Sequence, residues 1–121
     1  MSEIRERGSG EGVEMKTGGR VEMRRALDRE MRPFREAAKE ENPTRPLLRA
    51  VRQALGIPVA EIAEELEVRP SVVFALEESE RKGTISTRSL RLVAEAMGCK
   101  VVYGIVPEGG KTLRELAEER E

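Results

Sequence analysis

The chain has 121 residues, of which 37% are charged and only 2% are aromatic, a composition typical of small packed helices and unlike that of a β-sandwich. This length leaves room for one domain with a small core plus tails, and the formal net charge of −1 gives the chain as a whole no electrostatic reason to bind nucleic acid. No apolar run approaches the length that spans a bilayer, and the first seven residues lack the apolar core of a secretory signal, so we expect a cytoplasmic protein with no membrane partner.

The N-terminal part divides into a tail and a helical extension. Residues 1–19 are almost without apolar side chains and rich in glycine, which predicts a flexible tail. Residues 20–41 follow as a helical extension, in which Leu27, Met31, Phe34 and Ala38 form one apolar stripe. Pro33 interrupts this stripe, and we expect it to kink or split the helix at Arg32.

Residues 46–99 predict four short helices, which makes the fold class mainly α. Prolines open the first three, at Pro46, Pro58 and Pro70, and glycines follow the first and the last of the four. Ser86 or Thr87 can cap the fourth helix.

The C-terminal residues 100–121 predict one short β-strand and one short helix. Residues 100–106 are rich in β-branched side chains, and Thr112 can cap a helix over 113–120. A lone strand leaves its backbone groups unpaired, so we expect it to pair with residues 1–20 or with another chain, as a dimerisation or partner-binding element.

The second and third of the four helices have the spacing of a helix-turn-helix over residues 57–77. A small residue where the helices cross, an apolar plug in the turn and an apolar pair on the second helix hold two such helices at a steep angle. The predicted helix-turn-helix core is Ile62, Ala63, Val68, Val73 and Leu76.

The same residues resemble a known family. Residues 57–77 resemble the Xre-type, lambda-repressor-like helix-turn-helix proteins. Within that family the resemblance to the small proteins labelled "mobile mystery protein A" is close, over residues 23–28, 51–56, 73–80 and 94–103, with 106–107 and 112–113 following in the same order. The resemblance covers about residues 23–120. It implies a sequence-specific transcriptional regulator, often encoded beside a Fic-domain toxin as in a toxin–antitoxin pair. Glu67 stands where the family usually has a turn glycine, so here a non-glycine residue has to adopt the turn geometry.

Helical geometry assigns candidate DNA contacts around the third helix of the domain. Arg69 and Ser71 can contact base edges or phosphates, and apolar side chains can touch a thymine methyl group. The candidates for base contact are Arg69, Ser71, Val72, Ala75 and Glu78. The candidates for backbone contact are Arg49, Arg52, Arg81, Lys82 and Arg88. Glu77 and Glu80 are expected to be structural, bonding backbone or basic side chains.

Two alternatives remain open at this stage. Glu61, Glu64, Glu65 and Glu67 crowd the second helix of the domain, which weighs against DNA binding if they face the groove. If the strand over 100–106 instead docks on a partner such as a toxin, the chain is a protein-binding module. In the other hypothesis the chain binds double-stranded DNA as a homodimer. Pairing of the two strands then places two recognition helices for a palindromic site.

Enzymatic chemistry has little support. The chain has no histidine and one cysteine, Cys99, which excludes an intrachain disulfide and is expected to be a small buried residue. We find no acid–base, nucleophilic or metal-binding constellation, and so we predict no catalytic residues, no metal and no cofactor.

Overall fold

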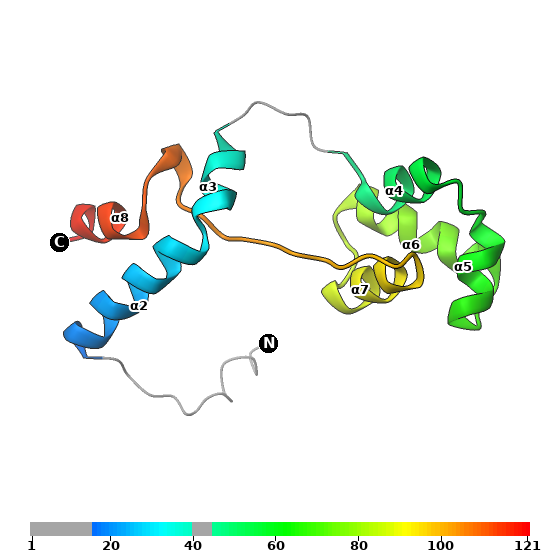
Figure 1. Cartoon of the computed structure of the whole chain (residues 1–121), viewed down its shortest axis with the longest axis horizontal. Helices are drawn as coiled ribbons and strands as arrows, with labels where there is room; N and C mark the ends of the chain where they lie inside the picture. Colours follow the sequence, from blue (N-terminus) through cyan, green and yellow to red (C-terminus); the bar gives the residue numbers. More distant parts are fainter. Residues whose placement is uncertain (1–15, 40–44) are drawn as a thin grey trace. The chain divides into compact units, whose positions relative to one another are not determined.

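A computed structural model describes residues 16–39 and 45–121 (Figure 1). The chain divides into two compact units, here called the central unit (Asn42–Tyr103) and the terminal unit (Met1–Glu41 with Gly104–Glu121). The sequence predicts the N-terminal extension and the C-terminal segment as separate elements, whereas the structure joins them in one unit. The prolines at positions 43 and 46 predict a linker over residues 41–46, and most of it lies outside the described residues.

The central unit consists of four helices, as predicted. Their bounds are Leu47–Leu55 (α4), Val59–Leu66 (α5), Pro70–Lys82 (α6) and Thr87–Ala96 (α7). Helix α6 packs against each of the other three. Pro46 and Pro58 lie just before their helices as N-cap residues, and Pro70 is the first helical residue of α6. The side chain of Ser86 accepts a hydrogen bond from Ser89 N at 3.0 Å and so caps α7, which confirms its predicted role.

An aliphatic core holds these helices together. Ile62, Val73 and Val93 are the largest side chains that are fully buried, and they come from α5, α6 and α7. Leu48 of α4 is 3% exposed in the same cluster. Burial of each such side chain contributes roughly 1.5–3 kcal/mol, so the packing of all four helices depends on this one cluster.

Helix α5 ends in a left-handed turn at a residue that is not glycine. Glu67 has φ 60° and ψ 46°, whereas the other three helices of the unit are followed by glycines with positive φ. The Val68 amide donates to Ala63 O at 2.9 Å and the Glu67 amide to Glu64 O at 3.1 Å, a Schellman arrangement that satisfies two carbonyls of α5. Glu67 therefore adopts the left-handed turn geometry despite its Cβ, as expected for a residue that stands at the position of a turn glycine.

The terminal unit contains two helices from each of its segments. They are Thr17–Glu30 (α2), Arg32–Ala38 (α3), the short 3₁₀ helix Glu108–Gly110 (η1) and Leu113–Glu119 (α8). The break between α2 and α3 at Met31 confirms the predicted effect of Pro33. The predicted tail boundary at residue 19 is wrong, because α2 already begins at Thr17. Its first turn tolerates Gly18, and the Arg20 amide donates to Lys16 O at 2.9 Å.

A carboxylate on α2 fixes the start of α8. Asp28 accepts hydrogen bonds from the backbone N–H groups of Leu113 at 2.7 Å and Arg114 at 3.2 Å. Thr112 and Glu115 form a reciprocal capping box at the same helix end, which confirms Thr112 as the cap. None of the described helices of this unit has a fully buried side chain. The unit is therefore held by caps and partly buried contacts rather than by a closed core.

The predicted β-strand over 100–106 is not found in the described part of the chain. Residues 99–107 form neither helix nor strand, and no described segment pairs with 100–106. A β-branched sequence favours extended backbone, but a strand also needs a neighbour for its N–H and C=O groups. Val102, Tyr103 and Ile105 are 67%, 60% and 80% exposed. At Gly104 a Cβ would lie 2.5 Å from Phe34 Cγ, so only glycine fits there.

Within residues 16–39 and 45–121, no helix combines the length and the apolar character that a membrane crossing requires.

The strained turn at Glu67 gives a first prediction. Glu67→Gly removes the Cβ from a left-handed backbone, and we expect it to stabilise the central unit by about 1 kcal/mol, which corresponds to a midpoint increase of roughly 4–8 °C. Thermal unfolding followed by circular dichroism measures the change. The control Glu67→Ala removes the same charge but keeps the Cβ, and an equal increase for alanine would contradict the backbone explanation.

The Asp28 cap gives a second prediction. Asp28→Ala leaves two amides of α8 without acceptors, and we expect it to destabilise that helix by about 1 kcal/mol. Amide exchange at Leu113 and Arg114 should then accelerate about fivefold. Asp28→Asn keeps an acceptor oxygen and serves as the control. Unchanged exchange in the alanine variant would show that the Thr112 and Glu115 box is sufficient.

Candidate nucleic-acid interface

Helix α6 has one face turned into the central unit and one turned outward. Val73 is fully buried, Leu76 is half-buried against the core, and Glu77 is 6% exposed. The side chains of Ser71, Phe74 and Ala75 are exposed. They follow the 3.6-residue period of a single helix face. The helix thus anchors itself along one stripe and leaves the opposite stripe available.

A buried ion pair links the inner face of α6 to α4. Arg52 donates from Nε to Glu77 Oε2 at 2.5 Å and from Nη2 to Glu77 Oε1 at 3.2 Å. Its Nη1 donates to Ile57 O at 3.3 Å. The hydrogen bond to Glu77 raises the pKa of the Arg52 guanidinium above its ordinary value, so the guanidinium keeps its charge inside the domain.

The predicted DNA-backbone role of Arg52 is therefore wrong. The residue is 9% exposed and its guanidinium is committed to Glu77 and Ile57, so it has no means of reaching a phosphate. A sequence signal for this existed. Leu48, Val51 and Arg52 fall at i, i+3 and i+4 of one helix, which places the arginine on the apolar stripe. Glu77 falls on the apolar stripe of α6 in the same way.

A second glutamate of α6 caps α4. The carboxylate of Glu80 accepts from the backbone N–H groups of Leu47 at 3.0 Å and Leu48 at 2.8 Å. These amides are among the four at a helix start that have no partner within the helix. The structural roles predicted for Glu77 and Glu80 are thus confirmed.

The outer face of α6 borders a concave surface. A groove of about 400 Å³ lies between α6 and the start of α4, lined by Pro46, Arg49, Ser71, Phe74, Ala75, Glu77, Glu78 and Arg81. None of the four glutamates at positions 61, 64, 65 and 67 lines it. The acidic side chains of α5 are exposed elsewhere on the domain. They therefore do not oppose the binding of phosphates at this groove.

Four of the five residues predicted to contact bases are exposed, and the fifth is engaged by another side chain. Arg69 is the exposed N-cap residue of α6, Ser71 and Ala75 line the groove, and Val72 is 40% exposed. Glu78 accepts two hydrogen bonds of 3.1 Å from Arg81 Nε, and this bonding lowers the pKa of the Glu78 carboxyl. Its charge is thus already paired within α6.

The predicted backbone contacts other than Arg52 lie at the surface. Arg49 and Arg81 line the groove, and Lys82 lies 4.0 Å from Glu78. Arg88 is exposed at the start of α7. The structure thus brings basic side chains from α4 and α6 together at the groove and places Arg88 on a third helix.

The predicted helix-turn-helix core is right at the crossing and wrong in the turn. Ile62, Ala63 and Val73 are at most 2% exposed, and Leu76 packs against them. Val68 is 37% exposed and so is not a buried plug. Its contribution is the backbone hydrogen bond to Ala63, while its side chain remains at the edge of the turn.

Comparison with protein families agrees with this geometry. Residues 48–103 match the family model described as "Helix-turn-helix", and the match begins in α4 and includes α5, α6 and α7. Residues 48–103 form a helix-turn-helix domain. Searches of curated proteins and of solved structures returned no match. The family match supports a DNA-binding regulator in general.

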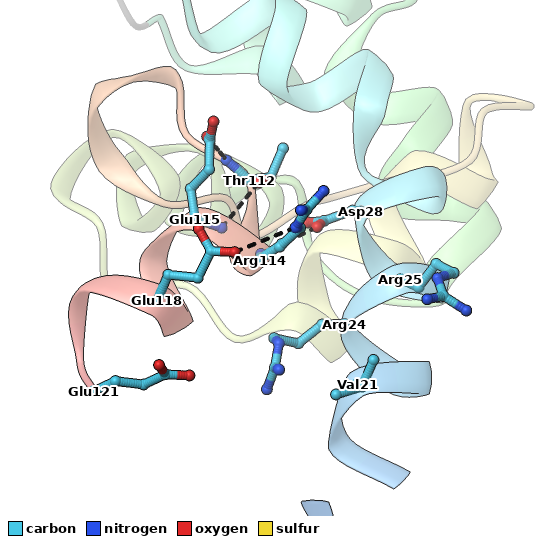
Figure 2. Close-up of a pocket in the computed structure, with 9 residues that line it drawn as sticks. All are labelled: Val21, Arg24, Arg25, Asp28, Thr112, Arg114, Glu115, Glu118 and Glu121. Atoms are coloured by element: carbon cyan, nitrogen blue, oxygen red, sulfur yellow. Dashed lines mark hydrogen bonds and ion pairs between the residues drawn. The ribbon is translucent and has the colours of Figure 1, made fainter. Parts of the chain in front are cut away.

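A second hollow lies outside the helix-turn-helix domain, between α2 and α8 of the terminal unit. It has a volume of about 870 Å³ (Figure 2). Arg24 extends toward its centre, and Glu118 bonds Arg114 at 3.4 Å on the α8 side. In the described part of the chain, no group of three or more His, Cys, Asp or Glu side chains is placed to hold a metal ion.

The buried pair of the helix-turn-helix domain gives a third prediction. Arg52→Met leaves Glu77 buried without its partner, and we expect a loss of about 3–5 kcal/mol in the free energy of unfolding. Urea unfolding followed by circular dichroism measures it. The matched control is Arg49→Met on the same helix, which should change stability by about 0.5 kcal/mol or less because Arg49 is exposed. A loss below about 1 kcal/mol in Arg52→Met would contradict the role of the pair.

Proposed function

We propose that the protein is a sequence-specific transcriptional regulator that inserts α6 into the major groove of double-stranded DNA. The observation that carries this proposal is the division of α6 into a fixed inner face and an accessible outer face beside Arg49 and Arg81. A recognition helix needs both, because its base contacts depend on a rigid seat in the domain. Phosphate contacts by basic residues supply affinity, and contacts of α6 with base edges supply specificity.

Within this proposal, Arg69 and Ser71 are the leading polar readers. They occupy the N-terminal end of α6, the part of a recognition helix that contacts base edges. The guanidinium of Arg69 has no hydrogen bond or ion pair within the described residues. It is therefore available for a guanine edge or a phosphate.

We further propose that two copies act together on a palindromic site. Within the described residues the backbone groups of segment 100–106 have no hydrogen-bond partner, and its apolar side chains are exposed; both favour pairing with the same segment of a second copy. A symmetric dimer presents two recognition helices to two half-sites.

The second candidate function is a protein-binding module. The same exposed segment, with Tyr103 60% and Ile105 80% exposed, favours strand addition to a partner protein. The resemblance to "mobile mystery protein A" would make that partner a Fic-domain toxin and the chain an antitoxin that also regulates its own gene.

Selection from a random duplex library tests the main proposal. The full chain is incubated with the library at low salt, the bound fraction is sequenced, and the Arg69→Ala, Ser71→Ala double variant is treated identically. We expect the wild type to enrich a palindromic motif that the variant does not, because the variant lacks the polar base contacts.

The matched control is Arg88→Gln. This change should weaken binding similarly for all sequences and reduce the slope of log affinity against log salt by about 1, as expected for one lost phosphate contact. Failure of the wild type to enrich any sequence at low salt would contradict DNA reading. It would favour the protein-binding alternative.

A further inference from the structure

The outer face of α6 and the turn before it are unusually apolar for an exposed surface. Val68, Val72 and Phe74 are 37%, 40% and 53% exposed, and Ala75 beside them is exposed as well. Single exposed apolar residues are normal, but Phe74 and Ala75 line the same groove and Val72 lies one helical turn before Ala75. Neighbouring exposed apolar residues of this kind mark an interaction surface.

The polar groups that share this face are few. Glu78 is bonded to Arg81, and Glu77 beneath the groove is bonded to Arg52. Past the first turn of α6, the contact surface offered to a ligand is therefore mainly carbon, with Phe74 as its largest side chain.

The major groove offers one apolar group to such a surface. Thymine presents a 5-methyl group there, and 5-methylcytosine presents the same group at the same position. We propose that Phe74, together with Val72 and Ala75, reads pyrimidine 5-methyl groups, so that the preferred half-site carries a methylated pyrimidine opposite α6. Phe74 contacts such a methyl only if α6 enters the major groove, so the assignment rests on the proposed function.

Charge at the groove favours DNA over an apolar peptide as the occupant. Arg49 and Arg81 line the groove beside Phe74. Arg69 is the N-cap residue of α6, and Lys82 is its last residue. The two carboxylates that line the groove, Glu77 and Glu78, are already bonded to Arg52 and Arg81. An apolar strip flanked by cations matches a methyl-bearing groove floor between two phosphate backbones.

The test uses the duplex selected by the wild-type protein. Each thymine of the half-site is replaced in turn by deoxyuridine, which removes only the methyl group. At one or two positions we expect binding to weaken about fourfold, the ratio that corresponds to burial of one methyl-sized group. The same positions are also made deoxycytidine or 5-methyldeoxycytidine, each paired with guanine. Stronger binding of the methylated form shows that the methyl group itself is read, and equal binding of the two forms restricts the reader to thymine.

Phe74→Ala should remove the sensitivity to deoxyuridine at those positions. The control Leu55→Ala changes a side chain of similar exposure, 54%, at the far end of α4, and it should leave the sensitivity unchanged. Thermal unfolding of both variants checks that they fold.

The outcomes separate the two proposals. If a motif is selected but no deoxyuridine substitution weakens wild-type binding, methyl reading is wrong and DNA reading stands. If no motif is selected and an apolar peptide binds instead in a Phe74-dependent way, both are wrong. The deoxyuridine arm needs only the wild-type protein and gives a result even if Phe74→Ala does not fold.

Discussion

Two carboxylates, one turn apart on α6, determine how the central unit is assembled. Glu77 is buried against Arg52, and Glu80 binds the first amides of α4. A buried carboxylate without a partner is costly, so α4 has only one favourable position on α6. Helix α6 also packs against α5 and α7, so all three other helices of the unit are positioned by contacts with it. These contacts use the inner face of α6 and hold its outer face in a fixed orientation.

The terminal unit also has a carboxylate that caps a helix, but this cap does not lie beside a hydrophobic core. Asp28 of α2 accepts from the first amides of α8, just as Glu80 does for α4. In the central unit the cap lies beside an aliphatic core, whereas the described helices of the terminal unit bury no side chain completely. A cap contributes about 1 kcal/mol, so the terminal unit depends much more on a few polar contacts. Within it, Phe34 lies so close to Gly104 that a Cβ on Gly104 would clash with the ring.

The elements that the sequence predicted correctly depend on local signals. Pro33 separates two helices, and Ser86 and Thr112 cap two others. Each of these effects acts over a few residues, so the chain pattern contains it.

The errors concern pairing at a distance. The strand over 100–106 needs a neighbour that the described chain does not supply. The cap from Asp28 to Leu113 spans 85 residues, and no local pattern announces it. Arg52 is a different case, because its place on an apolar stripe was visible. Arginine is mostly exposed in proteins, and only the helical periodicity indicates that this one is buried.

The separation of the two faces of α6 also bears on how such a protein changes over time. Most point mutations harm a protein through stability, by breaking packing or buried polar networks. On α6 those networks involve Val73, Glu77 and Glu80, whereas Phe74 and Ala75 contribute little to the fold. Substitutions at the outer positions therefore carry a small folding penalty. A lineage of such chains can exchange one binding preference for another by single steps, each of which leaves a folded protein.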